Sequence, residues 1–179
     1  MAGLSTALRR GLDKLYLWYF VSHIPITLMF DVLPLLPSSM IPQTLLDMNS
    51  LVTDKLGDPL VVVGEGHPEL VWFRSILVCE IFLQLPFFFY AVWALWTDCP
   101  RRHLPLLVYG VHVSTIMAPI LGTLIRGEIN RTCSERMLLV SIYLPYLLIP
   151  LSIVFVSFTE CSRALTAAQA TSSSKRKTQ

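Results

Sequence analysis

The sequence predicts an all-α membrane protein, a bundle of four transmembrane helices with proline-bent helices and a ligand cavity inside the membrane. Of its 179 residues, 54% are hydrophobic and 15% are charged, and the mean hydropathy is +0.60. These values are atypical of a soluble domain of this size. A helix needs roughly 20 apolar residues to cross a hydrocarbon core about 30 Å thick. Runs of that length lie at approximately 12–36, 71–96, 104–125 and 137–158.

The first predicted helix carries polar groups that lipid disfavours. The stretch "SHIPITLMFD" contains His23, Pro25 and Asp31. At about 1.5 Å per residue from Leu12, His23 lies about 16 Å into the bilayer and Asp31 about 28 Å, near the opposite face. At that depth Asp31 either reaches water or serves a binding site, and position alone leaves both interpretations open. A structural role is favoured for His23, hydrogen-bonded to a second mid-helix histidine or to a carbonyl.

The second predicted helix places Glu80 near mid-membrane, about 14 Å from the face that Asp31 approaches. An acid at the centre of a helix costs roughly 2.5 to 3.5 kcal/mol on insertion scales, so Glu80 is a candidate functional residue. Gln84 follows four residues later and shares its face. If Asp31 and Glu80 face one cavity, they cannot both ionise cheaply. We assign the retained proton to Glu80, so the pair carries about one negative charge and matches a ligand with one ammonium group.

The third and fourth predicted helices offer weaker candidates. His112 lies mid-helix, and a structural role is favoured for it too. Tyr143 and Tyr146 are spaced i and i+3, so they either pack in the core or present aromatic faces and hydroxyls to a steroid ring or a cation.

Every predicted helix contains an interior proline. A proline removes one backbone donor and bends the helix, and four bent helices leave room for a cavity between them. These prolines are Pro25, Pro86, Pro119, Pro145 and Pro150.

The charges predict the orientation. Basic residues flank the first helix, fill the second loop and end the chain, so both termini are expected in the cytosol. The loop 37–70 is mostly acidic and is expected on the other side. The basic residues form no stripe, so no nucleic-acid partner is expected.

The tail 164–179 is rich in Ala, Ser, Thr and Lys, lacks an apolar face and is expected to be disordered after a membrane domain at 1–163. Lys175 and Lys177 in the final "KRKTQ" fit either a dibasic retrieval signal of the endoplasmic reticulum or an ordinary positive flank. Asn130 begins a glycosylation sequon whose occupancy is not expected in so short a loop.

The sequence lacks the usual catalytic motifs, such as G-x-S-x-G, H-E-x-x-H and the P-loop. Two buried histidines without clustered cysteine or carboxylate ligands do not make a metal site. We therefore expect neither a metal nor a cofactor.

Five segments together resemble the EXPERA superfamily, which includes ligand-binding receptors and the sterol Δ8-Δ7 isomerase (emopamil-binding protein). They are "YFVSHIPITLMFD", "LGDPL", "WFRSILVCEIFLQLPFF", "VYGVHVSTIMAPIL" and "SIYLPYLLIP". The resemblance covers nearly all of residues 15 to 155. It implies a multi-pass receptor of the endoplasmic-reticulum membrane, with the nuclear envelope, lysosome and plasma membrane as further locations.

The resemblance also implies roles for particular residues. Asp31 matches the family aspartate that pairs with a ligand amine, and Glu80 matches the glutamate that hydrogen-bonds it. Asp58 matches an aspartate needed for binding, which we interpret as structural, because an exposed-loop Asp before proline can organise a turn over the pocket. The remaining positions match pocket or pocket-adjacent residues: Gln84, Tyr109, Tyr143 and Tyr146, with His23, His112 and Pro86 as structural neighbours.

The implied ligands are sterols or oxysterols and cationic amine drugs. The implied biology is cholesterol homeostasis, with the lipid bilayer, the Niemann-Pick type C cholesterol transporter, the LDL receptor and a second copy of the chain as partners. Unlike the isomerase, this chain has Thr27 where a second acid follows the histidine. Moving a sterol double bond needs one acid and one base, so we expect binding without isomerisation, with the isomerase as the alternative.

Overall fold

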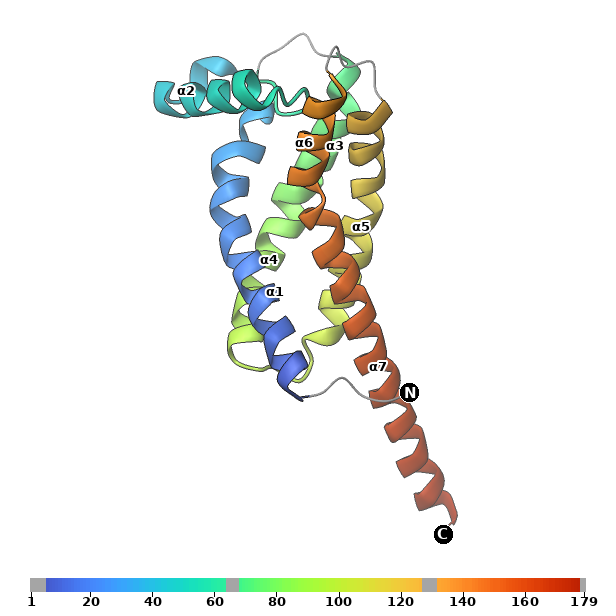
Figure 1. Cartoon of the computed structure of the whole chain (residues 1–179). Helices are drawn as coiled ribbons and strands as arrows, with labels where there is room; N and C mark the ends of the chain where they lie inside the picture. Colours follow the sequence, from blue (N-terminus) through green and yellow to red (C-terminus); the bar gives the residue numbers. More distant parts are fainter. Residues whose placement is uncertain (1–5, 64–67, 127–131, 178–179) are drawn as a thin grey trace.

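The computed structural model describes residues 6–63, 68–126 and 132–177, and over these ranges it contains helices and loops without a strand. Four helical spans in this part of the chain are long and apolar enough to cross a membrane: Ala7–Leu35, Val71–Trp96, His103–Arg126 and Cys133–Ser173. They stand side by side as a bundle (Figure 1). The predicted all-α class with four spanning helices is confirmed, and the predicted and observed second spans coincide.

Each span is built from one or more helical elements. The first consists of α1 (Thr6–Ile26), a π-helical turn η1 (Thr27–Asp31) and a short 3₁₀ turn η2 (Leu33–Leu35). The second consists of α3 (Val71–Cys79), a π-helical turn η6 (Glu80–Gln84) and α4 (Leu85–Trp96). The third is α5 (His103–Arg126), and the fourth is α6 (Cys133–Tyr143) followed by α7 (Pro145–Lys177).

Three of these irregularities lie beside prolines. Pro25 precedes η1 by two residues, and Pro86 follows η6 by two. A proline ring clashes with the carbonyl four residues before it; for Pro86 this is the carbonyl of Phe82, which lies inside η6, where the π turn widens the backbone spacing. In the fourth span, α6 ends at Tyr143 and Pro145 begins α7, since proline is tolerated at the first position of a helix.

The connection between the first two spans forms its own helices at one end of the bundle. It contains η3 (Ser38–Met40), α2 (Gln43–Leu51), the π turn η4 (Val52–Leu56) and η5 (Pro68–Leu70). Figure 1 shows α2 lying across that end. The loop after η4 begins with Gly57, whose φ of 67° is left-handed and suits a residue without a side chain. Asn49 Nδ2 donates to the Val61 carbonyl at 3.1 Å and holds this loop against α2.

The core has aromatic rings at its centre, and on one side of the bundle two helices approach each other closely. Phe20 and Phe88 are fully buried and pack against Tyr109 at centroid distances of 5.0 and 5.9 Å. On the other side α5 packs along α7. A Cβ placed on Gly110 of α5 would lie only 2.8 Å from Val154 Cγ2 and 2.9 Å from the Pro150 carbonyl oxygen, so glycine is required for this close approach.

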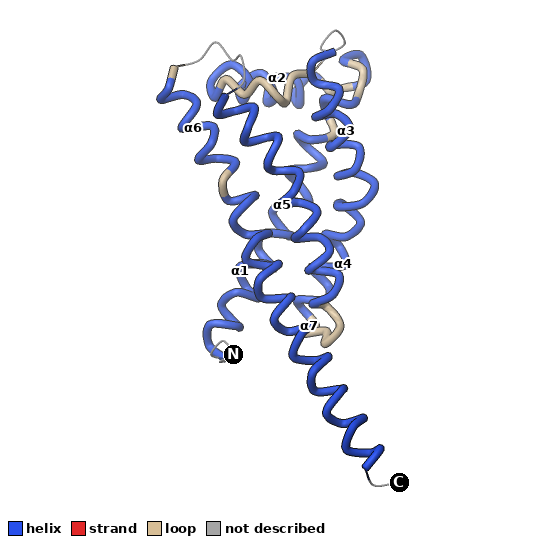
Figure 2. The backbone as a smooth tube through the Cα atoms, turned by 90° about the vertical axis from the view of Figure 1, so that its right-hand side faces the viewer, coloured by secondary structure: helices blue, strands red, loops and turns tan. Residues whose placement is uncertain are grey.

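The start of α1 and the end of α7 lie at the same end of the bundle, opposite α2, and α7 projects beyond the other helices (Figures 1 and 2). Over residues 164–177 of the tail that composition predicts to be disordered, α7 instead continues through Lys177. Residues 164–173 are exposed and bury no apolar face, yet they include good helix formers such as Ala and Gln that continue an established helix. Asn130 lies outside the described residues.

Candidate functional site

A cavity of about 260 Å³ lies among the four spans near the end that carries α2. Its wall combines an apolar majority with a smaller polar group. Apolar side chains such as Leu77, Val113 and Met117 form most of the wall. The polar residues are Tyr19, His23, Asp31, Asp58, Glu80, Gln84, Tyr143 and Tyr146. This combination is typical of a site for a largely apolar small molecule with a few polar groups.

The structure brings Asp31 and Glu80 together, although their sequence positions place them about 12 Å apart along the membrane normal. The Asp31 carboxyl hydrogen-bonds the carboxyl of Glu80 and the hydroxyl of Thr27. Thr27 is fully buried and its Oγ1 donates to Glu80 Oε1 at 2.8 Å. Because an ionised carboxylate can only accept hydrogen bonds, a bond between two carboxyls requires a proton on one of them. With that bond formed, the pair holds at most one negative charge against an apolar wall.

The backbone places both acids in widened turns. Asp31 is the last residue of η1, and Glu80 is the first residue of η6. Single π turns inside α-helices occur frequently at functional sites, because they aim side chains in directions that a regular helix does not offer. Two such turns on facing spans bring their acids into one hydrogen-bonded group.

Two fully buried polar atoms of residues in the cavity wall have no hydrogen-bond partner among the described residues. They are His23 Nδ1 and Gln84 Nε2. The His23 ring is held between Tyr19 and Tyr146, at centroid distances of 4.7 and 4.9 Å. Gln84 lines the same cavity as Glu80, as their spacing predicts. Buried polar groups are normally paired, so these atoms are positioned to bind a ligand or water.

His112 differs from His23 in position. It does not line the cavity, and its Nε2 likewise has no partner within the described part of the chain. Of the two alternatives that the sequence leaves open for His23, a hydrogen bond to His112 is not found among the described residues.

Asp58 is buried at 6% exposure, although the sequence suggests an exposed loop position. Its Oδ1 accepts from the Leu60 backbone amide at 2.9 Å, which forms the expected turn around Pro59. Its Oδ2 accepts from the Tyr143 hydroxyl at 2.6 Å, and so ties the loop to α6. Burial raises the pKa of Asp58 above its ordinary value, while these hydrogen bonds act in the opposite direction.

The other predicted residues divide between the wall and its surroundings. Tyr143 and Tyr146 line the cavity. Tyr109 lies behind the wall, where its hydroxyl hydrogen-bonds that of Tyr19 at 3.1 Å. Pro86 is exposed and lies in the first turn of α4.

Lys175 and Lys177 belong to the last turn of α7, at the opposite end of the bundle from the cavity.

Sequence reasoning missed two contributors to the site. The sequence singles out Thr27 only because it stands where the isomerase has an acid, yet in the structure Thr27 hydrogen-bonds both carboxyls. Its place four residues before Asp31 is the pattern that could have identified it, since residues at that spacing share a helix face. Tyr19 is similarly placed four residues before His23, whose ring it contacts.

Comparison with known proteins gives consistent matches. The profile of the EXPERA family (EXPanded EBP superfamily) matches residues 46–157. Sigma intracellular receptor 2 of Xenopus tropicalis is 40% identical over 149 residues, covering 79% of this chain and 84% of the relative. The Homo sapiens protein of the same name is 37% identical over 155 residues, covering 80% and 85%.

A more distant relative is Efficient mitochondria targeting-associated protein 19 of Saccharomyces cerevisiae. It is 32% identical over 159 residues, covering 80% of this chain and 96% of the relative. The resemblance that the five sequence segments indicate, to the EXPERA superfamily and within it to the sigma-2 receptor, is confirmed.

Proposed function

Because the chain belongs to the EXPERA family, we propose that it is a membrane receptor that binds sterols or oxysterols and cationic amphiphilic amines in the cavity between its helices. Two relatives that are 40% and 37% identical to it over the aligned residues are named as receptors, which supports this class of function. The proposal concerns binding without catalysis.

The observation that carries the proposal is the hydrogen-bonded group of Asp31, Glu80 and Thr27 in an apolar wall. A single negative charge at low dielectric attracts one ammonium group far more strongly than it would in water. The apolar wall then receives the body of the ligand, and Tyr146 offers an aromatic face and a hydroxyl. A sterol, which has no cation, would place its hydroxyl among the same polar groups.

The test is to replace Asp31→Asn and measure the affinity of the purified protein for a radiolabelled cationic amphiphilic amine and for a radiolabelled oxysterol. Asn preserves the size of the side chain and removes its charge. We expect the amine affinity to fall at least about tenfold, with a smaller change for the neutral oxysterol. Asp54→Asn is the matched control, because Asp54 is an exposed acid on η4 outside the cavity wall. Equal amine affinity in both variants would refute the role of Asp31.

A sterol Δ8-Δ7 isomerase is the second candidate, and one observation favours it: His23, with an unpaired ring nitrogen, lines the same cavity as Glu80. Against it, Thr27 supplies a hydroxyl where the isomerase has an acid, and a hydroxyl is a poor proton acceptor. Expression in cells that lack the isomerase distinguishes the two functions. Persistent Δ8 sterols support the receptor, and their disappearance supports the enzyme.

A purely structural role for the acid pair is a third possibility to test. If the carboxyls only join helices, ligands will leave the thermal stability unchanged. A bound ligand at a hundredfold its dissociation constant instead adds about 2.7 kcal/mol to the free energy of unfolding. The thermal unfolding of the purified protein with and without the oxysterol separates these outcomes.

The same proposal extends to the cell. We place the receptor in the endoplasmic-reticulum membrane with both termini in the cytosol, acting in cholesterol homeostasis, with the Niemann-Pick type C cholesterol transporter, the LDL receptor and a second copy of the chain as partners. Lys175→Ala with Lys177→Ala tests the retrieval signal by microscopy. Release to later compartments supports it, and an unchanged location leaves the lysines as a positive flank. Co-purification of the tagged chain with each partner tests the interactions.

A further inference from the structure

A second hollow, of about 670 Å³, lies at the other end of the bundle from the cavity. The start of α1, the turn between α4 and α5, and the middle of α7 surround it. Its wall carries four basic side chains, Arg9, Arg10, Lys14 and Arg102, against three acids. Nothing in the proposed receptor function uses this hollow.

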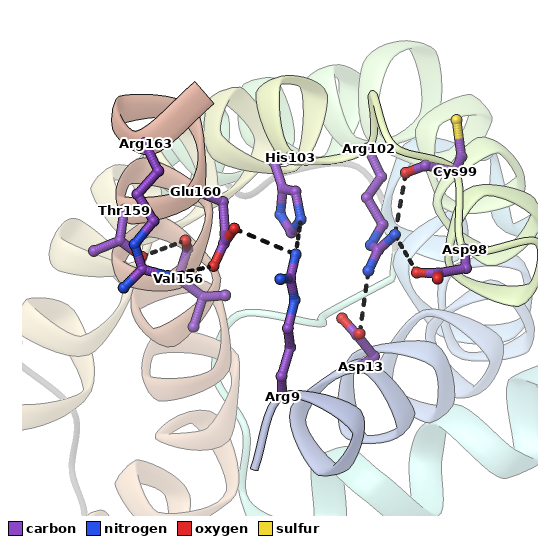
Figure 3. Close-up of polar contacts among 10 residues, drawn as sticks. All are labelled: Arg9, Asp13, Asp98, Cys99, Arg102, His103, Val156, Thr159, Glu160 and Arg163. Atoms are coloured by element: carbon purple, nitrogen blue, oxygen red, sulfur yellow. Dashed lines mark hydrogen bonds and ion pairs between the residues drawn. The ribbon is translucent and has the colours of Figure 1, made fainter. Parts of the chain in front are cut away.

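The acids pair with only two of these four cations (Figure 3). Arg9 contacts Glu160 at 3.4 Å, and Arg102 contacts both Asp13, at 3.2 Å, and Asp98. Arg10 and Lys14 are exposed and have no acid partner in the described chain. The hollow therefore retains positive charge that the protein itself does not neutralise.

The buried groups of the wall add unused hydrogen-bond donors. Arg9 Nη2 donates to His103 Nε2 at 3.0 Å. Because a guanidinium can only donate, Nε2 must be the acceptor, and the ring hydrogen then sits on Nδ1. His103 Nδ1 has no partner among the described residues, and neither has Arg102 Nε. His103 and Arg102 are only 9% and 4% exposed, so both of these N–H groups are costly to leave unpaired.

An anion in the hollow would match the charge that Arg10 and Lys14 leave unpaired. The hollow lies where the first span begins and the third span starts, which is the depth of lipid headgroups. Basic pockets between membrane helices on the cytoplasmic side can bind phosphorylated headgroups. We propose that this hollow binds the phosphate of an anionic lipid headgroup, with Arg10 and Lys14 supplying the charge and a small movement of the wall giving the phosphate access to the N–H groups of His103 and Arg102.

The experiment measures binding to the purified full-length chain by native mass spectrometry. The probes are dioctanoyl phosphatidylinositol 4-phosphate, dioctanoyl phosphatidylcholine, and the soluble inositol 1,4-bisphosphate, which shares the phosphates without the acyl chains. We expect saturable binding of the phosphoinositide, weaker binding of the soluble anion and no saturable binding of phosphatidylcholine. Equal affinity for inositol 1,4-bisphosphate would assign the site to a free anion and overturn the lipid proposal.

The variant Arg10→Gln with Lys14→Gln removes both free cations and leaves intact the Arg9–His103 hydrogen bond and the ion pairs of Arg102. Each basic residue near an anionic membrane surface contributes about fivefold in affinity, so phosphoinositide binding should weaken about 25-fold. The matched control, Arg101→Gln with Arg126→Gln, removes the same charge outside the hollow and should change affinity less than about twofold. Equal effects of the two variants would overturn the proposal, and thermal unfolding without probe verifies that both are folded.

Discussion

Removing the Tyr143 hydroxyl tests how the loop after η4 is held over the ligand cavity. In Tyr143→Phe, Asp58 Oδ2 loses the donor that lies 2.6 Å away, while Oδ1 keeps the Leu60 amide at 2.9 Å. The carboxyl is only 6% exposed, so water does not replace the lost bond. A hydrogen bond to a charged group contributes about 1.5 to 3 kcal/mol. For a chain of this size that corresponds to a melting temperature lower by roughly 3 to 12 °C.

The assay is thermal unfolding of the purified variants in one detergent, together with amine affinity. Tyr90→Phe is the control, because it removes a tyrosine hydroxyl that lies outside the cavity wall. The double variant Tyr143→Phe with Asp58→Asn should be destabilised by less than the sum of the single changes, since both remove the same bond. If Tyr143→Phe has the same melting temperature as the wild type, or if the losses of stability in the two single variants sum to that of the double variant, the bond does not hold the loop.

Three further predictions concern other parts of the structure. Burial raises the pKa of Asp58 in the folded protein above its ordinary value of 3.8, so protonation of Asp58 favours the folded state. This contribution to stability is fully present below pH 3.8 and is lost as pH rises through the folded-state pKa. Asp58→Asn should therefore flatten the pH dependence of the melting temperature. Gly110→Ala should lower the free energy of unfolding by about 1 to 3 kcal/mol, because the new Cβ forces α5 away from α7. Gly122→Ala should raise it by about 0.5 to 1 kcal/mol, because its new Cβ meets nothing within 4 Å. Equal melting temperatures of the two variants would contradict the close approach at Gly110. Thr27→Val keeps the shape of the side chain but removes the donor to Glu80. Amine affinity should therefore change, with little effect on oxysterol affinity. If the ratio of amine affinity to oxysterol affinity is the same in the variant and the wild type, Thr27 does not belong to the site.

The sequence predicts the spans well because hydrocarbon thickness imposes a length that composition alone reveals. It identifies Asp31 and Glu80 as acids inside the membrane, but the depths that the rise per residue gives them differ by about 12 Å, so their contact does not follow from depth. The success with the spans rests on one dimension, the membrane normal. Position around the helix axis is harder to predict, because the π turns at η1 and η6 rotate the residues that follow them and leave no pattern in composition.

The differences elsewhere have equally physical causes. Asp58 is buried because Tyr143, 85 residues away in the chain, reaches it, and no local pattern encodes that contact. Tyr109 lies behind the wall because Tyr19 occupies the position between it and the cavity. The segment after Ala164 is helical because it continues α7, although its composition indicates no packing.

The two π turns also have a consequence for how this binding site could change. Each inserts roughly one residue beyond what a regular helix would use, and one residue corresponds to about 100° of rotation. Deleting a single residue from η1 would therefore swing Asp31 away from Glu80 while leaving the first span long enough to cross the bilayer. The proposed charge-binding chemistry of the site is thus separable from the membrane architecture that carries it, and a single-codon deletion would remove the first without dismantling the second.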